Sequence, residues 1–153
     1  MNITVLYGTE SGNSELIAED LAAKLNEDHT AEVFDLADFD PNNMTADKFY
    51  ILVCSTHGEG ELPNTALPFW DALNAAAPNL DGVRYAVFGL GDTFYEETYS
   101  HGSEILDKRF TELGAKRVGE YGRHDASSWD LGTDLALEWL PGVVEAFEAE
   151  TVS

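Results

Sequence analysis

Cationic residues are scarce in this chain. Its 153 residues include 8 Lys and Arg against 29 Asp and Glu, which gives a formal net charge of −21 at pH 7. A protein this acidic repels phosphate backbones and anionic lipid surfaces, and it attracts basic partners. We therefore expect no binding to nucleic acid and none to a membrane. A second explanation also fits the acidity, because excess charge keeps a protein soluble in a saline cell.

Cysteine and long hydrophobic runs are scarce as well. The single cysteine, Cys54, excludes an internal disulfide and a thiolate metal cluster, and its place at the end of an apolar run favours a buried packing role. No apolar run approaches the roughly 20 residues that span a bilayer. The first residues, MNITVLYG, show no basic segment and no cleavage site. These absences predict a soluble, cytoplasmic protein.

Several catalytic patterns are also missing. The sequence contains no H-E-x-x-H, C-x-x-C or G-x-S-x-G motif. Its histidines at positions 29, 101 and 124 lack the spacing of metal ligands. Residues 89–92, GLGD, do not form a dinucleotide fingerprint, because Phe94 stands where the third glycine is required. We therefore expect no catalytic side chain and no metal site.

The chain does contain an alternation of two hydrophobic patterns. Short apolar runs predict strands at residues 2–7, 31–36, 48–55, 83–90 and 115–122. Apolar residues at helical spacing predict helices up to residue 25, at 69–76, at 103–114 with a stop at Gly114, and from 129 to 150, where Pro141-Gly142 kinks or divides the last one. Strands that alternate with helices form a parallel sheet covered on both faces. We predict one α/β domain over residues 1–153.

Polar loops follow the expected strands, and the first of them suits a phosphate group. Residues 9–14, TESGNS, combine hydroxyl groups, an amide and a glycine at the start of a helix, where unpaired N–H groups favour an anion. The loop has no lysine and lacks the spacing of a nucleotide-triphosphate loop, so a lone phosphate monoester fits it better. An ordinary capped turn explains the same residues equally well.

Aromatic side chains occur in two further loops. His57 follows the third expected strand, and Tyr95 and Tyr99 follow the fourth. Such side chains can hold a planar aromatic ligand by stacking. For each residue taken singly, ordinary packing is the commoner explanation. Their common position beyond the strand ends, where ligands of such sheets bind, favours a ligand site.

Four segments together resemble the flavodoxin family over essentially the whole chain. They are YGTESGNSE, STHGEGELPNTALPFWDAL, FGLGDTFYEETYSHGSEILDKRFTELGAKRVGE and LALEWLPGV. The chain looks like a short-chain member, because its fifth strand runs through without a long insertion. The loop STHGEGELP is similar to MioC-like flavodoxins and to the FMN domains of diflavin reductases. The resemblance implies a doubly wound five-stranded parallel sheet of order 2-1-3-4-5 that binds FMN non-covalently.

The resemblance also implies which residues hold the FMN. The phosphate belongs in the turn 9–14, the ring lies between segments 55–59 and 89–99 with Tyr95 stacked on it, and Asp125 is near the ribityl chain. His57 stands where many flavodoxins carry a tryptophan, and a histidine side chain ionises at about pH 6.5. The predicted cofactor-binding residues are Thr9, Glu10, Ser11, Gly12, Asn13, Ser14, Ser55, Thr56, His57, Gly58, Glu59, Gly89, Leu90, Gly91, Asp92, Tyr95, Tyr99 and Asp125.

On this interpretation the protein is a monomeric electron carrier that transforms no substrate of its own. It receives electrons from a flavodoxin/ferredoxin-NADP reductase-type donor and passes them, one at a time, to redox acceptor proteins that dock through a basic surface. The 153 residues contain no NADP-binding module, so we expect the carrier half alone. Two alternatives stay open: a small flavin-dependent quinone reductase, and a non-redox interaction module with a degenerate site. The acids expected to surround the ring are Glu59, Glu61, Asp92, Glu96 and Glu97.

Overall fold

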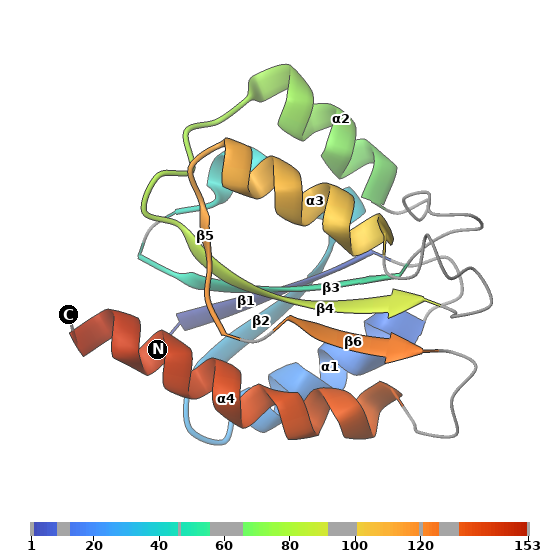
Figure 1. The fold of residues 1–153 in the computed structure, drawn as a ribbon, viewed down its shortest axis with the longest axis vertical. Helices are drawn as coiled ribbons and strands as arrows, with labels where there is room; N and C mark the ends of the chain where they lie inside the picture. The colour runs from blue at the N-terminus through green and yellow to red at the C-terminus, as the bar shows by residue number, and fades with distance from the viewer. Residues whose placement is uncertain are drawn as a thin grey trace.

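The structure, a computed structural model, is built around a parallel β-sheet with two helices on each face (Figure 1). It describes residues 2–8, 13–45, 47–55, 66–91, 101–119, 121–125 and 132–152. The strands are β1 (Asn2–Gly8), β2 (Thr30–Asp35), β3 (Phe49–Ser55), β4 (Arg84–Gly91), β5 (Lys116–Arg117) and β6 (Gly122–Asp125). The helices are α1 (Asn13–Leu25), α2 (Leu67–Ala76), α3 (His101–Glu112) and α4 (Gly132–Val152), with short 3-10 turns η1 (Leu36–Asp38) and η2 (Pro41–Asn43).

The strands pair in the order β2-β1-β3-β4-β5, and β6 also pairs with β4. Every pairing is parallel. Helices α1 and α4 cover one face of the sheet, and α2 and α3 cover the other (Figure 1). The predicted doubly wound sheet with strand order 2-1-3-4-5 is confirmed.

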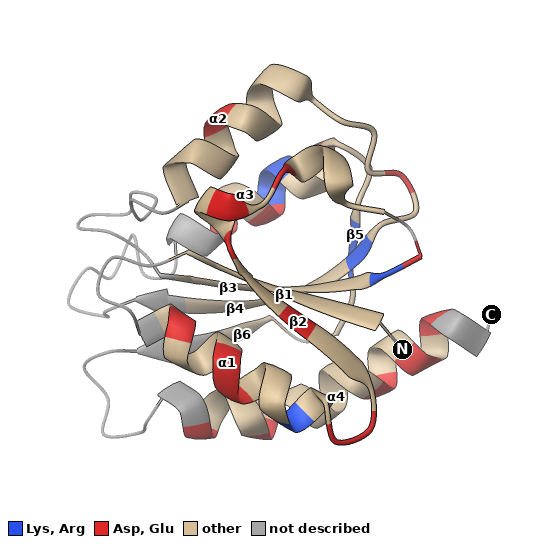
Figure 2. Ribbon diagram, turned by 180° about the vertical axis from the view of Figure 1, so that it is seen from behind, with Lys and Arg blue, Asp and Glu red and all other residues tan. Residues whose placement is uncertain are grey.

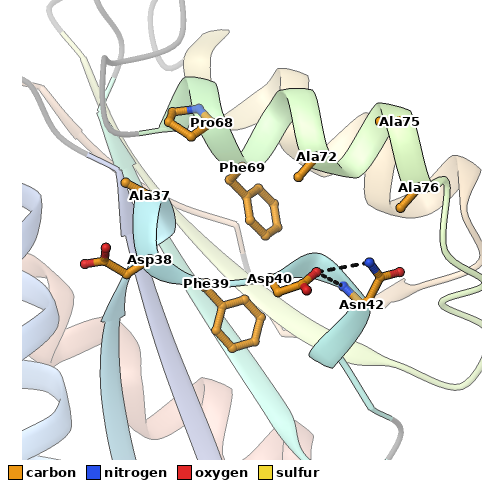
Figure 3. A pocket seen from close by; sticks show the side chains of 10 residues that line it. All are labelled: Ala37, Asp38, Phe39, Asp40, Asn42, Pro68, Phe69, Ala72, Ala75 and Ala76. Carbon is orange, nitrogen blue, oxygen red and sulfur yellow. Dashed lines mark hydrogen bonds between the residues drawn. The ribbon is translucent and has the colours of Figure 1, made fainter.

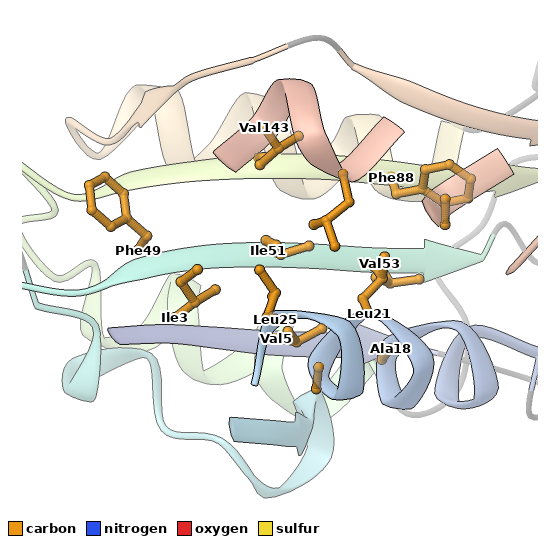
Figure 4. Packing of buried hydrophobic residues seen from close by; sticks show 14 of the residues in the cluster. Ile3, Val5, Ala18, Leu21, Leu25, Phe49, Ile51, Val53, Phe88 and Val143 are labelled. Atoms are coloured by element: carbon orange, nitrogen blue, oxygen red, sulfur yellow. The ribbon is translucent and has the colours of Figure 1, made fainter. Parts of the chain in front are cut away.

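The central strands are buried on both faces, which explains their continuous apolar runs. In β3, Ile51 and Val53 face α1 and α4, whereas the alternate residues Leu52 and Cys54 face α2 and α3. Figure 4 shows the first of these cores, in which Leu21 of α1 packs beside the strand residues. Alternation of side chains between the two faces therefore builds two cores from one strand.

The fifth strand is not the single segment that the sequence predicts. Tyr85 of β4 pairs with Arg117 of β5, and Phe88 of β4 pairs with Gly122 of β6. Phe88 lies three residues after Tyr85, but Gly122 lies five residues after Arg117. The segment between β5 and β6 therefore has two residues more than β4 can pair with. The chain turns out of the sheet at this point, where Gly119 has a positive φ of 79°. The expectation of an uninterrupted strand over 115–122 is wrong, and the pairing extends instead to residue 125.

Helices α3 and α4 behave differently at the residues where the sequence predicts an interruption. Helix α3 stops before Gly114, which has a φ of 108°, as the glycine predicts. Helix α4 continues through Pro141 as one element, so of the two expected effects of Pro141, a kink or a division, the division is wrong and the kink stays a prediction. The ring of Phe147, beyond the proline, stacks on Phe49 of β3 with centroids 4.4 Å apart. This packing on the sheet keeps the second half of α4 in place despite the missing N–H.

Candidate functional site

The carboxyl ends of four strands are level with one another across the sheet. Gly8 pairs with Cys54, and Ser55 on the same strand pairs with Leu90. The register continues from β4 to β6, where Gly91 pairs with Asp125. Strands β3, β4 and β6 all point to the same side of the molecule in Figure 1. Because neighbouring strands are about 4.8 Å apart, this carboxyl edge brings residues from distant parts of the chain within reach of one small ligand.

Ser14 gives this edge a polar group that lacks a partner. It is the second residue of α1 and has 0% of its surface exposed. Among the described residues, its Oγ has no hydrogen-bond partner. Burial of a hydroxyl without a hydrogen bond is costly, so such a group points to a bound acceptor.

The start of α1 favours an anion as the acceptor for the Ser14 hydroxyl. The first N–H groups of an α-helix have no partners inside the helix, and the helix dipole places partial positive charge at this end. Helix α1 has 13 residues, and its buried Ser14 hydroxyl lies within its first turn. The residues present therefore fit a phosphate group that is held by neutral donors.

The structure brings the described members of the predicted site to this one edge. Asn13 and Ser14 open α1, and the remaining members are the last residues of β3, β4 and β6. The members in these strands are Ser55, Gly89, Leu90, Gly91 and Asp125. The part of every predicted residue in binding FMN stays a prediction. The predicted residues that lie outside the described part of the chain are Thr9, Glu10, Ser11, Gly12, Thr56, His57, Gly58, Glu59, Asp92, Tyr95 and Tyr99.

One residue that supports the edge has no signal in the sequence. Gly122 starts β6 and lies against Phe88 of β4 and Trp139 of α4, whose rings are 5.4 Å apart. A Cβ on Gly122 would lie 2.5 Å from Cδ2 of Phe88 and 3.0 Å from two atoms of Trp139. The glycine is needed because two aromatic rings close on its backbone, and only the tertiary structure brings those rings together.

Cys54 lies just behind the carboxyl edge and is fully buried. Burial raises the pKa of its thiol to about 12, so the thiolate that a nucleophile requires is not formed near neutral pH. The interpretation of Cys54 as a packing residue is confirmed. In the part of the chain that the structure describes, no group of His, Cys, Asp and Glu side chains could hold a metal ion.

Positive charges gather at the opposite, amino edge of the sheet. Arg84 begins β4 and pairs in register with Lys116 of β5, and Lys48 directly precedes β3. Two ion pairs form there: Lys116 with Glu150 at 2.8 Å, and the neighbouring Arg117 of β5 with Asp107 of α3 at 2.6 Å. The blue segments in Figure 2 lie on β5, on α3, near the amino ends of strands and in the last turn of α1.

The carboxyl edge carries the opposite charge. Burial, together with the nearby carboxylates of Asp35 and Glu15, raises the pKa of the Tyr7 hydroxyl. The segments that continue from the strand ends, residues 9–12, 56–65, 92–100 and 126–131, contain no Lys or Arg. Their acidic residues are Glu10, Glu59, Glu61, Asp92, Glu96, Glu97 and Asp130. The sequence that follows these strand ends is therefore acidic, whereas β6 itself contains Arg123, and acids such as Glu150 and Asp107 pair with the cations of the amino edge.

Comparison with known proteins identifies the family. A family model described as Flavodoxin matches residues 5–139. The chain belongs to the flavodoxin family. FMN is the cofactor of this family, and its members carry electrons. The sequence resemblance to flavodoxins is confirmed, and the length of 153 residues is that of a short-chain member.

Individual relatives agree with this assignment. The chain is 40% identical over 146 residues to the sulfite reductase NADPH flavoprotein alpha-component of Bacillus subtilis strain 168, with 94% of this chain and 23% of that protein covered. It is 32% identical to Protein MioC of Escherichia coli O157:H7, with 91% and 93% covered. The chain thus spans about a quarter of the length of the sulfite reductase flavoproteins that it matches, but most of MioC.

Solved flavodoxin structures share the fold over nearly the whole chain. A cysteine-to-alanine mutant of flavodoxin from Pseudomonas aeruginosa has a TM-score of 0.86 at 30% identity, with 97% of this chain and 99% of that chain covered. Oxidised flavodoxin 1 from Bacillus cereus has a TM-score of 0.79 at 28% identity, with 95% and 98% covered. Within the described residues, no helix is both long enough and apolar enough to cross a membrane.

Proposed function

We propose that residues 1–153 form one FMN-binding domain that carries electrons, one at a time, between a reductase and redox acceptor proteins. The observation that carries this proposal is the buried Ser14 hydroxyl, which has no hydrogen-bond partner among the described residues and lies in the first turn of α1. A phosphate at this point gives the hydroxyl an acceptor. The proposed location is the cytoplasm, because a chain with one cysteine needs no oxidising compartment.

Each part of the carboxyl edge has its own task in this proposal. When bound, FMN supplies the reversible uptake of electrons. The Ser14 hydroxyl and the first N–H groups of α1 donate hydrogen bonds to its phosphate and fix one end of the cofactor. Gly89 and Gly91 have no side chain to keep a ring away from the end of β4. The acidic loop residues 59, 61, 92, 96 and 97 disfavour added negative charge on the cofactor, which makes the reduced protein a stronger electron donor.

The acidity of the chain and of the loops after the strand ends supports a basic partner. The net charge of −21 attracts a positively charged protein, and the acidic loops that follow the strand ends, which contain no Lys or Arg, favour docking of that protein at the carboxyl edge. The proposed donor is a reductase of the flavodoxin/ferredoxin-NADP type, and the acceptors are redox proteins with a basic docking surface. In this proposal the carrier itself is a monomer and transforms no substrate.

The phosphate contact predicts a difference between FMN and riboflavin. FMN should raise the free energy of unfolding by about 2.7 kcal/mol once free FMN reaches 100 times its dissociation constant, because it binds only the folded chain. Riboflavin lacks the phosphate and should stabilise the fold much less at equal concentration. Urea unfolding of the FMN-free protein, with each ligand added in turn, measures both effects. Equal stabilisation by the two ligands would contradict the proposed phosphate site, and no stabilisation by either would favour a non-redox module.

The proposed docking predicts a salt-dependent rate of electron transfer. Reduction of cytochrome c, a basic acceptor, by the chemically reduced protein should slow by about tenfold or more as salt rises from about 0.01 M to about 1 M, because salt screens steering between exposed charges. Reduction of a neutral quinone serves as the control and should change little. A rate with cytochrome c that does not depend on salt would refute electrostatic docking. Steady turnover of NADPH with the quinone, catalysed by the protein alone, would instead identify a quinone reductase.

A further inference from the structure

A groove runs along α2, on the face of the sheet opposite α1 and α4. It lies between α2 and the segment that contains η1 and η2, and it has a volume of about 620 Å³. The rings of Phe39 and Phe69 lie in the space between its two walls (Figure 3). We call this feature the α2 groove and define it by Ala37, Phe39 and Asp40 on one wall and Pro68, Ala72 and Ala76 on the other.

Helix α2 is unlike the other helices of this acidic protein. Asp71 is the only charged residue among its ten, whereas 24% of the whole chain is charged. The α2 side of the groove exposes proline and alanine side chains, and Leu67 at the start of the helix is 43% exposed. Exposed apolar surface of this kind costs free energy in water, which favours a partner that covers it.

The charges at the groove select the partner. Asp40 lies at the wall opposite α2, where its carboxylate accepts hydrogen bonds from the backbone N–H and the side-chain amide of Asn42 (Figure 3). The carboxylate of Asp38, on the same segment, points away from α2, and no Lys or Arg is among the residues that line the groove. In Figure 2, α2 shows one acidic segment and no basic one. A second copy of this chain, with its net charge of −21, would be repelled by these carboxylates, and so would an anionic membrane. The complementary occupant is therefore cationic.

The shape of the groove indicates what kind of cationic segment fits. From Pro68 to Ala76 the helix rises about 12 Å, which is a little over two helical turns. Alanine side chains on this wall let another helix approach closely, while the half-buried ring of Phe39, which covers the buried Phe69, offers an apolar contact in the middle. An amphipathic helix with an apolar face and flanking Lys or Arg side chains meets both conditions.

We propose that the α2 groove is a docking site for a cationic amphipathic helix of a redox partner. Ala37 follows the carboxyl end of β2, and Pro68 is the second residue of α2, so these two residues mark the end of the groove nearer the carboxyl edge. A helix held there lies beside the edge where FMN is proposed to bind. The role of the helix in electron transfer rests on the proposed function, but its binding to the groove does not.

A designed peptide tests the groove directly. The probe is a synthetic 18-residue helical peptide with leucine and alanine along one face and lysine on both flanks, and the control peptide has the same residues in an order that forms no apolar face. Binding is followed by fluorescence anisotropy, and the contact surface is mapped from amide shifts in NMR spectra of the full chain. The probe should bind and shift amides of α2, η1 and η2, while the shuffled peptide should bind at least about tenfold more weakly.

Two variants and two controls locate the binding. Ala72→Arg places a positive charge in the groove, which repels the lysines of the probe, and should weaken binding of the probe by about tenfold or more. Ala149→Arg adds the same charge to an exposed position on α4 and should have little effect. Asp40→Asn removes the charge on the groove wall and keeps an oxygen for the Asn42 N–H, so it should weaken binding of the probe by about two- to fivefold, the effect of losing an exposed ion pair. Glu145→Gln on α4 is its control. All four positions are exposed, so the fold should persist.

Specific results overturn the proposal. Equal binding of the two peptides, or equal loss in Ala72→Arg and Ala149→Arg, would show attraction by net charge alone. A dimer whose interface includes α2, or binding of uncharged lipid vesicles that Ala72→Arg abolishes, would assign the groove to a different occupant. FMN affinity is measured separately on each variant and should not change. Loss of peptide binding in a protein that binds FMN refutes the groove alone, and failure to bind FMN refutes the proposed function alone.

Discussion

Ser14→Ala should weaken the binding of FMN by about 10- to 100-fold and leave the fold intact. A hydrogen bond from a buried hydroxyl to a charged acceptor contributes about 1.5–3 kcal/mol, which corresponds to this range. The FMN-free protein should lose no stability, because in the described part of the chain the hydroxyl has no partner to lose. Removal of a buried polar group without a partner can even raise the free energy of unfolding.

Two comparisons make this result specific to the phosphate. Affinity for riboflavin should be the same in Ser14→Ala and in the parent protein, since riboflavin lacks the phosphate. Thr4→Val is the matched control, because Thr4 is also buried, at 3% exposed, but lies in β1 away from the carboxyl edge. This control should not change the affinity for FMN. Fluorescence titration measures all these affinities, and an equal loss for FMN and riboflavin in Ser14→Ala would show a general change of the site instead.

Gly122→Ala should lower the free energy of unfolding by about 1–3 kcal/mol, the usual cost of overpacking. The new methyl group would meet Phe88 at 2.5 Å and Trp139 at 3.0 Å. Phe88 is 1% exposed and packs between the sheet and α4, so its ring has no free space to move into. The strain falls on β6, whose last residue, Asp125, pairs with Gly91 at the carboxyl edge. FMN affinity should therefore fall together with stability.

Gly142→Ala is the matched control for this substitution. A Cβ on Gly142 meets nothing within 4 Å, and the residue lies inside α4. Alanine should therefore stabilise the protein by about 0.5–1 kcal/mol, because it restricts the unfolded chain and favours the helix. Urea unfolding measures both variants. If Gly122→Ala unfolds at the same urea concentration as the parent protein, the close packing of β6 against Phe88 and Trp139 is wrong.

Some features of the fold could not be predicted from local patterns. The run around residues 115–122 has the composition of a strand, but two residues too many separate Arg117 from Gly122 for both to pair with β4. Pro141 predicts an interruption, and yet α4 continues because Phe147 stacks on Phe49 of a distant strand. In both cases the deciding contact joins residues far apart in the sequence, and a local window contains no information on it.

The sequence by itself determined the class of fold and the family. Apolar runs such as residues 48–55 require burial on both faces, and the helices between them supply the cover, so a parallel sheet covered on both faces follows from the hydrophobic pattern. The doubly wound order 2-1-3-4-5 was implied by the resemblance to flavodoxins. The polar loops after the strands, with their order and spacing, were enough to indicate flavodoxins and FMN. The net charge of −21 already indicated a basic partner.

Only the tertiary structure decided which groups are buried, aligned or left without a partner. The sequence offers Ser14 as an ordinary helix cap, but packing buries its hydroxyl beside the strand ends, where in the described residues it has no acceptor. The alignment of Gly91 with Asp125, the aromatic rings around Gly122 and the groove along α2 also depend on contacts between distant segments. Hydrophobic periodicity reports whether a residue faces a core, whereas the identity of its neighbours is set only when the strands pair and the helices pack upon them.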